Sequence, residues 1–351
     1  RVNKNIIINI KPKNKKNNFY KNKIDYSGYS FYFKNNPYPN IEKVSNLFKY
    51  LFWFNLSFLI CVKDLLFFKN WLNSFLFFEA VKSKLFQYSE KDQIPYIFIT
   101  PYNGSINRSL WTLDLKKNIK RSYIFFYSTN GDGYKTKFHN PNNVNNGWGE
   151  LDYEHFLVWD KYQANTLKKY LKVKKPKIIT IGPMLFSCSG KNDTIDLTQK
   201  FIVIFDIVPE RFSYNFFRSY SIIKPKHIIK FQNDILKIAN ELNINVLHKI
   251  KRKRSDTIVS KSYLKNMLNL KKFNNYKQIN ENQSIETLVK KSKGVISFPY
   301  TSTSLIAKYM KKPTIYYDSS KCLIDIEERI QSHGVKIINN IDELRVWMKK
   351  V

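Results

Sequence analysis

The chain is constrained most by a repeated alternation of short β-rich runs and helical segments, which begins near residue 94 and continues to its end. Strands that alternate with helices form βαβ units, in which parallel strands pair beneath the helices. The first run predicts strands at 94–100, 122–128, 155–159 and 177–181. The second run predicts strands at 201–207, 245–250, 276–279, 294–298, 314–317 and 335–338.

The polar residues 187–200 separate the two runs and predict a linker. The chain is therefore expected to be an α/β protein with two Rossmann-like domains, at 94–186 and 201–351. Ligands of such domains bind at the carboxyl ends of the strands, so we expect the domains to face a cleft. This is the GT-B-like arrangement of glycosyltransferases, and the composition equally allows an epimerase or a binding protein.

Residues 1–93 predict a basic arm followed by an apolar helical extension. The first 23 residues carry eight Lys or Arg and no acid. Apolar residues at three- and four-residue spacing from Val44 to Gln87 predict two helices that meet near Lys63. The longest apolar stretch, Leu51 to Val62, is shorter than the roughly 20 residues that cross a bilayer. These helices either lie on an anionic membrane surface or cover the first domain.

The charge balance is strongly basic, with 60 Lys and Arg against 27 Asp and Glu and a formal net charge of +33. No RNP, helix-turn-helix or zinc-finger pattern accompanies this charge, so a nucleic-acid binder is the weaker interpretation. A+T-rich codons produce the same bias toward Lys, Asn, Ile, Phe and Tyr. Cys61, Cys188 and Cys322 are far apart and form no CxxC pair, which predicts neither a disulfide framework nor a zinc site. We expect a cytoplasmic protein without a metal or cofactor, with membrane association through residues 1–93.

The residues that follow the predicted strand 294–298 indicate an anion site. Four hydroxyl side chains open the next helix, namely Thr301, Ser302, Thr303 and Ser304. A helix start offers unpaired N–H groups and the positive end of the helix dipole, which together favour phosphate. The alternative is that these hydroxyls only cap the helix.

Further candidates lie where other strands of the second run end. A basic run after the strand 245–250 supplies possible phosphate ligands, or else is a solvated charge run; its members are Lys249, Lys251, Arg252 and Arg254. Asp206 interrupts an apolar strand, either facing the cleft or holding a neighbouring loop. Other cleft candidates are Glu210, Arg211 and Asp318.

A general base for an acceptor hydroxyl is sought in the Gly- and Asn-rich loop 130–149. Asp132 directly follows a strand end within Asn-Gly-Asp-Gly and is the first candidate, although Asp-Gly is also a common turn. The Asp-Gly is similar to the acidic-Gly motif of some bacterial sialyltransferases. His139 is the second candidate.

Several blocks from about residue 95 onward resemble, in order, the polysaccharide biosynthesis PFTS-motif family. The blocks are RSLWTLDLKK with IFFYSTN, HFLVWDKYQAN, GPMLFS, FDIVPER, KRKR, SFPYTSTSLIAKYMKKPTIYYD and a later HG. The namesake motif reads Pro299-Tyr300-Thr301-Ser302, with Tyr in place of Phe. Residues 1–90 contribute little to the resemblance.

The resemblance implies a GT-B-like enzyme of surface polysaccharide assembly. We expect a glycosyltransferase that moves a sugar from a nucleotide-sugar to a growing glycan or a lipid-linked acceptor, with an inverting mechanism. No Asp-x-Asp pair follows a strand, which favours transfer without a metal. A nucleotide-sugar epimerase and a polyol-phosphate transferase are the alternatives. The sequence leaves the donor, the acceptor, the stereochemistry and the oligomeric state open.

Overall fold

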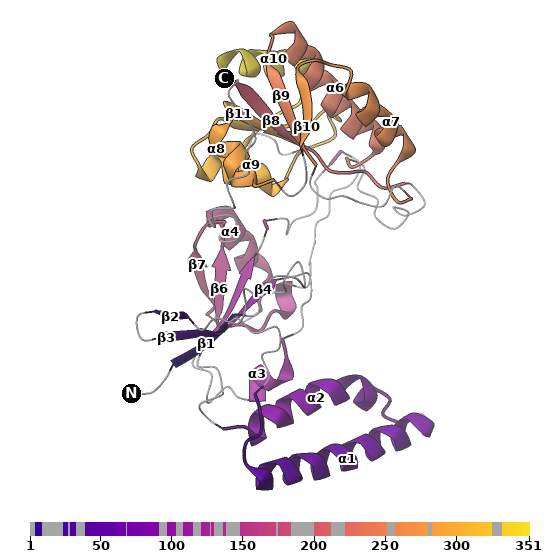
Figure 1. Cartoon of the computed structure of the whole chain (residues 1–351), viewed down its shortest axis with the longest axis vertical. Helices are drawn as coiled ribbons and strands as arrows, with labels where there is room; N and C mark the ends of the chain where they lie inside the picture. Colours follow the sequence, from indigo (N-terminus) through magenta and orange to yellow (C-terminus); the bar gives the residue numbers. More distant parts are fainter. Residues whose placement is uncertain are drawn as a thin grey trace. The chain divides into compact units, whose positions relative to one another are not determined.

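The computed structural model describes residues 4–8, 24–26, 29–32, 39–67, 69–90, 97–102, 108–114, 121–126, 128–129, 136–137, 148–172, 175–183, 200–211, 222–250, 257–279, 283–324 and 332–351. The chain divides into two compact units, which are shown in Figure 1. The first unit comprises Arg1–Tyr127, Asn145–Val158 and Leu167–Thr180. The second unit comprises Ser128–Val144, Trp159–Thr166 and Ile181–Val351.

The first unit is built on a seven-stranded sheet in the order β2-β3-β1-β4-β5-β6-β7. Its strands are β1 (Lys4–Ile8), β2 (Ile24–Tyr26), β3 (Tyr29–Tyr32), β4 (Ile97–Tyr102), β5 (Arg121–Phe126), β6 (His155–Val158) and β7 (Lys177–Thr180). All neighbours pair in parallel except β2 and β3, which are antiparallel. The four predicted strands of the first run are present, with ends that shift by up to three residues.

The helices of the first unit lie between its strands in the sequence and are α1 (Val44–Leu66), α2 (Leu72–Tyr88), α3 (Leu110–Asp114) and the short 3-10 helix η3 (Trp148–Glu150). A further helix, α4 (Lys161–Tyr170), follows β6 and is divided between the two units. The two predicted helices of the extension are present, and they meet a few residues after Lys63, because α1 continues to Leu66 and α2 begins at Leu72. Asp64 accepts a hydrogen bond from Asn73 Nδ2 at 2.8 Å, which ties the end of α1 to the start of α2.

The second unit is built on a six-stranded parallel sheet in the order β10-β9-β8-β11-β12-β13. Its strands are β8 (Phe201–Phe205), β9 (Asn245–Lys249), β10 (Tyr276–Ile279), β11 (Gly294–Ser297), β12 (Thr314–Tyr317) and β13 (Lys336–Ile338). Numbered within this sheet, the order is 3-2-1-4-5-6, which is that of doubly wound Rossmann domains. The chain reverses its direction of winding between β8 and β11.

Helices cover both faces of this sheet. They are α6 (Pro225–Glu241), α7 (Lys261–Leu270), α8 (Ile285–Lys291), α9 (Ser302–Tyr309) and α10 (Ile341–Lys350). Figure 1 shows α8 and α9 on one face and α6 and α7 on the other. All five residues of β8 are buried, as expected for a central strand between two helical layers.

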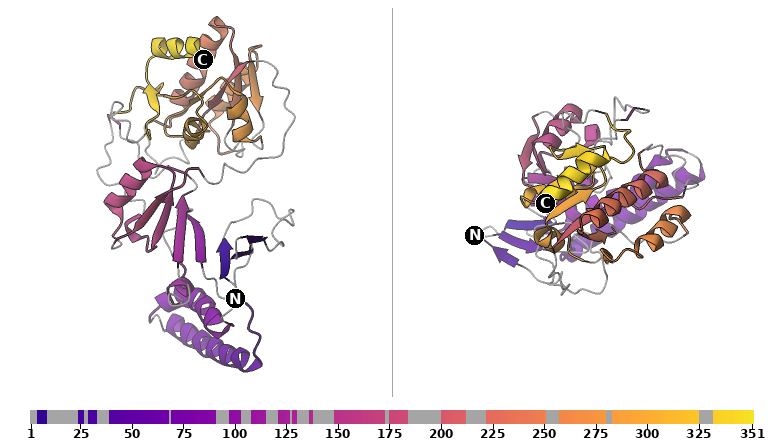
Figure 2. Two further views of the ribbon diagram at one scale, coloured as in Figure 1. Left: turned by 90° about the vertical axis from the view of Figure 1, so that its left-hand side faces the viewer. Right: turned by 90° about the horizontal axis from the view of Figure 1, so that it is seen from above.

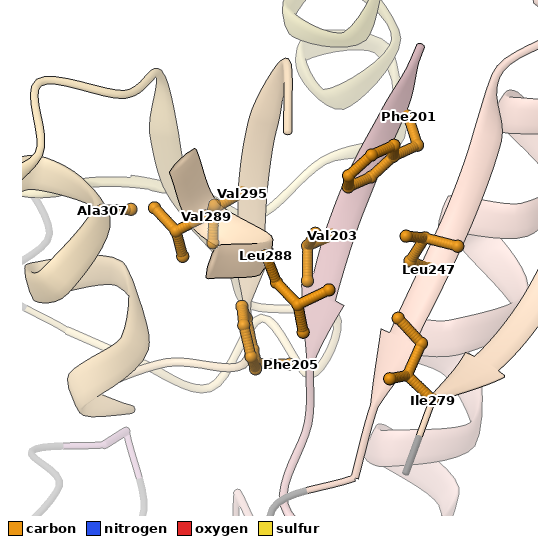
Figure 3. Close-up of a cluster of buried hydrophobic side chains, with 9 residues drawn as sticks. All are labelled: Phe201, Val203, Phe205, Leu247, Ile279, Leu288, Val289, Val295 and Ala307. Carbon is orange, nitrogen blue, oxygen red and sulfur yellow. The ribbon is translucent and has the colours of Figure 1, made fainter. Parts of the chain in front are cut away.

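The core on the face of α8 and α9 is a cluster of nine buried apolar residues, drawn in Figure 3. Phe201, Val203 and Phe205 alternate along β8 and point to this face. Leu288 and Val289 of α8 pack against them. The predicted α/β class, with two parallel-stranded sheets and an N-terminal helical extension, is confirmed.

Candidate functional site

Four neighbouring strands bring most of the predicted site residues of the second unit to one edge of its sheet. Because the strands are parallel, their carboxyl ends meet at the same edge. Lys249 ends β9, Asp206 follows β8, the hydroxyl-rich turn follows β11, and Asp318 follows β12. The point of reversal between β8 and β11 lies at the middle of this edge, where open α/β sheets bind ligands.

The turn between β11 and α9 is held in one conformation by bonds on both sides. The Phe298 N–H donates to Phe205 O of β8 at 2.8 Å, and the Tyr316 hydroxyl donates to Thr301 O at 2.8 Å. Tyr300 adopts a left-handed conformation with φ of 62°, which a non-glycine residue adopts at a cost. The turn therefore places the start of α9 at the carboxyl edge.

The N-terminus of α9 has no side-chain cap. The Thr301 hydroxyl donates to Phe298 O at 2.9 Å instead. Thr303 Oγ1 lies 3.0 Å from Ser297 Oγ and 3.2 Å from Thr301 Oγ1. These hydroxyls therefore bind one another rather than the N–H groups of the first helical turn, which have no intrahelical acceptors.

The remaining two hydroxyls of the turn differ in exposure. Ser304 is fully buried, and its hydroxyl donates to Ile315 O at 3.2 Å. Ser302 is half-buried, and its hydroxyl makes no hydrogen bond to another described residue. Of the four hydroxyl residues predicted to bind phosphate, Ser302 is therefore the one whose side chain is available to a bound molecule. The first-turn N–H groups are available as well.

Asp206 is the centre of a buried polar network. Its Oδ2 accepts hydrogen bonds from Gln232 Nε2 at 2.7 Å and from the Tyr263 hydroxyl at 2.8 Å. Its Oδ1 lies 3.2 Å from His248 Nε2, which is within ion-pair distance but too poorly angled for a hydrogen bond. His248 Nδ1 lies 2.8 Å from the Tyr276 hydroxyl.

The network determines the charge state of Asp206. Burial by itself raises the pKa of this carboxyl, but the charge of His248 and the hydrogen bonds of Tyr263 and Gln232 outweigh it. The pKa of Asp206 is therefore held below its usual value. Burial and the nearby Asp206 charge raise the pKa of Tyr263 and of Tyr276. Asp206 is fully buried, and its hydrogen bonds to Gln232 of α6 and Tyr263 of α7 tie β8 to these two helices.

The two loops that follow β8 and β9 pair with each other. The Arg211 N–H donates to Ile258 O at 2.8 Å, the Ser260 N–H donates to Pro209 O at 3.0 Å, and Glu210 forms a β-bridge with Val259. Arg211 also donates from its side chain to Val259 O at 3.1 Å. Lys249 is buried at the end of β9. Lys251, Arg252 and Arg254 lie outside the described residues.

Asp318 organises the loop after β12. Its Oδ1 accepts from the Ser320 N–H and hydroxyl, and its Oδ2 accepts from the Leu323 N–H at 3.1 Å. Cys322 and Leu323 of this loop pair with residues 136–137, because the Lys137 N–H donates to Cys322 O at 2.9 Å and Thr136 bridges Leu323. Asp132 and His139 lie outside the described residues.

An Asp–His pair in the second unit was not predicted. His333 Nδ1 lies 2.9 Å from both carboxylate oxygens of Asp160, which also caps α4 by accepting from the Gln163 N–H. Burial by itself raises the pKa of Asp160, but His333 and the backbone hydrogen bonds outweigh it. The pKa of Asp160 is therefore held below its usual value. A Cβ at Gly334, which has a φ of 76°, would come within 2.9 Å of Tyr162 Oη. Asp160 and His333 fall within sequence blocks that resemble the PFTS-motif family, but nothing in their spacing along the chain indicates that they pair.

No group of three or more His, Cys, Asp or Glu side chains within the described ranges could hold a metal ion. Cys61 and Cys322 are free thiols.

Residues 55–348 match the family model of the polysaccharide biosynthesis PFTS motif proteins. The chain therefore belongs to this family, as the ordered sequence blocks predict. No curated protein sequence matches the chain.

Solved structures similar to this chain include two enzymes of nucleotide-sugar chemistry. The UDP-GlcNAc 2-epimerase of Methanocaldococcus jannaschii, in complex with UDP-GlcNAc and UDP, is 12% identical with a TM-score of 0.45, over 78% of this chain and 74% of that chain. Phytolacca americana UGT2, complexed with UDP-2fluoro-glucose and pterostilbene, is 12% identical with a TM-score of 0.42, over 92% and 78%.

The Asp206 network predicts a pH-dependent loss of stability on mutation. Asp206→Asn removes the charge that faces His248, and it should lower the free energy of unfolding at neutral pH by about 1 to 3 kcal/mol. The folded pKa is depressed, so the stabilisation is present above the unfolded pKa of about 3.9 and is lost as the pH falls through the lower folded value. Urea unfolding from pH 7 to pH 3 should show the difference between variant and wild type shrinking at the acid end.

Asp342→Asn is the matched control, because Asp342 is exposed on α10 and pairs only at the surface with Arg345. Its effect should stay below about 1 kcal/mol. Equal effects of the two substitutions at pH 7 would contradict the role assigned to the buried network.

Proposed function

We propose that the protein is a glycosyltransferase of polysaccharide biosynthesis that binds a nucleotide-sugar at the carboxyl edge of the second sheet. The observation that carries this proposal is the uncapped start of α9 beside the reversal point between β8 and β11. The proposed transfer is metal-independent and inverting, and the acceptor is a growing glycan or a lipid-linked sugar.

The start of α9 suits a phosphate for electrostatic reasons. The first-turn N–H groups have no intrahelical acceptors, and the helix dipole places partial positive charge at this end. No acidic residue lies in the first turn of α9 to occupy that positive end. The first-turn N–H groups and the Ser302 hydroxyl would hold the phosphate of the donor, and the same groups would stabilise the charge that develops on the departing nucleotide.

The basic run after β9 is proposed to neutralise the rest of the phosphate charge. Lys251, Arg252 and Arg254 follow Lys249, which ends a strand two positions from β11 in the sheet. A charge-assisted hydrogen bond from such a side chain contributes about 1.5 to 3 kcal/mol. Two or three of these contacts would bind a diphosphate without a metal ion.

Asp132 is proposed as the general base that removes the proton from the acceptor hydroxyl, with His139 as the alternative. Both residues are close in sequence to Thr136 and Lys137, which pair with the loop after β12. That loop begins at the same edge of the sheet as the start of α9. A carboxylate or imidazole within hydrogen-bond reach of the acceptor would accelerate transfer by about 10² to 10⁴.

Ser302→Asp tests the phosphate site. An acid in the first turn interacts favourably with the helix dipole, so the variant should fold with equal or slightly higher stability. Its carboxylate would repel a bound phosphate, and nucleotide affinity should fall at least about tenfold, or 1.4 kcal/mol. Calorimetric titration with UDP, CMP and GDP is the measurement.

Ser284→Asp provides the control. Ser284 caps α8, the helix that follows the edge strand β10, and its substitution adds the same charge to the same domain. It should leave nucleotide affinity within about twofold, because β10 lies three positions from β11 in the sheet. At about 4.8 Å per position the separation is about 14 Å, which exceeds a Debye length of about 8 Å. Wild-type affinity in Ser302→Asp would show that the donor binds elsewhere.

Asp132→Asn tests the catalytic base. The variant should lose at least about 100-fold in turnover while binding nucleotide as the wild type does, because only the proton transfer is removed. Release of nucleotide from the nucleotide-sugar, measured with and without acceptor, is the assay. A comparable loss in His139→Ala, with little loss in Asp132→Asn, would move the role to His139. Release that needs no acceptor would contradict glycosyl transfer.

A further inference from the structure

The hairpin of α1 and α2 carries most of the exposed large apolar residues among those described. No residue of α1 is buried. Phe48, Phe52, Leu59 and Leu66 are 68%, 74%, 63% and 70% exposed. At 3.6 residues per turn these four positions lie within about 40° of one another, so they form one stripe along the whole helix.

This stripe faces away from the rest of the first unit. α1 packs against α2 through other residues, with Phe54 and Phe58 5.5 Å and 6.1 Å from Phe77 between ring centroids. α2 in turn packs on α3, where Phe86 stacks on Trp111 at 4.1 Å. Figures 1 and 2 show α1 as the outermost helix of the first unit, with α2 between it and α3. The stripe is therefore left without a protein partner among the described residues.

The apolar surface continues around the turn of the hairpin. Phe67, Trp71, Phe75 and Phe78 are 66%, 55%, 71% and 70% exposed. Together with the stripe they form a surface that we call the hairpin surface, made of Phe48, Phe52, Leu59, Leu66, Phe67, Trp71, Phe75 and Phe78.

We propose that the hairpin surface docks into the interface of a lipid bilayer that contains anionic head groups. Lys49, Lys63 and Lys69 are exposed on the same hairpin, and the whole chain carries a net charge of +33. Lys side chains near an anionic leaflet are attracted to its head groups, and burial of the apolar side chains strengthens the binding. Trp71 lies at the turn, and Trp is enriched at the boundary between lipid and water.

The hairpin lies in the interface and does not cross the bilayer. By length and composition alone, α1 could span a membrane. However, α2 runs back along α1, since the Asn46 amide near the start of α1 donates to Tyr88 O at the end of α2 at 3.1 Å. A spanning α1 would carry the Glu79–Lys82 ion pair of α2, at 2.7 Å, into the hydrocarbon. Ionised side chains at that depth are costly, so the surface position is favoured.

Flotation of the full chain with vesicles tests this inference, and it needs no glycosyl transfer. The vesicles contain phosphatidylcholine alone or phosphatidylcholine with phosphatidylglycerol. The double variant Phe52→Glu, Leu59→Glu is compared with Leu268→Glu, Val346→Glu, whose residues are 63% and 53% exposed on α7 and α10. Both variants add the same charge at exposed apolar positions, and thermal melting checks that both remain folded.

The wild type and the control variant should float with the anionic vesicles, and the hairpin variant should partition at least tenfold more weakly. The substitutions remove the burial of two large apolar side chains, and tenfold, or about 1.4 kcal/mol, is a lower bound for that loss. Failure of the wild type to bind would overturn the proposal, and so would equal binding of the hairpin variant, because charge alone would then suffice. A dimer that the hairpin variant dissociates, without vesicle binding by the wild type, would assign the surface to a second copy.

Discussion

Parallel pairing of β8 with β9 and β11 is the constraint on which the candidate site depends. β8 pairs with β11 from Ile202–Gly294 to Phe205–Ser297, and the Phe298 N–H extends the pairing by donating to Phe205 O. Both faces of β8 are buried, so a shift of one residue would exchange the two sets of core side chains. This register determines where β11 ends, and therefore where α9 begins.

Polar groups at the carboxyl edge divide into those that stabilise the edge and those that are open to a ligand. Asp206, Ser304 and Asp318 are fully buried, and protein groups bind each of them. Their hydrogen bonds hold the ends of β8, β11 and β12 and the loops that follow. A rigid frame of this kind costs little reorganisation when a ligand binds, which is the condition for effective electrostatic stabilisation of a transition state.

Local patterns predicted much of the fold. The spacing of the apolar residues and the capping Asn340 predict the last helix from local sequence alone, and α10 begins directly after that residue. The sequence alone does not decide whether Asp206 faces the cleft or holds a neighbouring loop. Its partners Gln232 and Tyr263 lie 26 and 57 positions away in the chain. Pairing at such separations depends on the tertiary fold, as it does for Asp160 and His333.

The central claim is that the first-turn N–H groups of α9 hold the phosphate of a nucleotide donor. Amide hydrogen exchange of the full chain, with and without saturating UDP, CMP or GDP, tests it most directly, because exchange reports on these N–H groups themselves. The account predicts that a nucleotide that binds slows exchange at residues 302–304, while the start of α8 is unchanged. Binding that leaves residues 302–304 unchanged and protects another segment would contradict it.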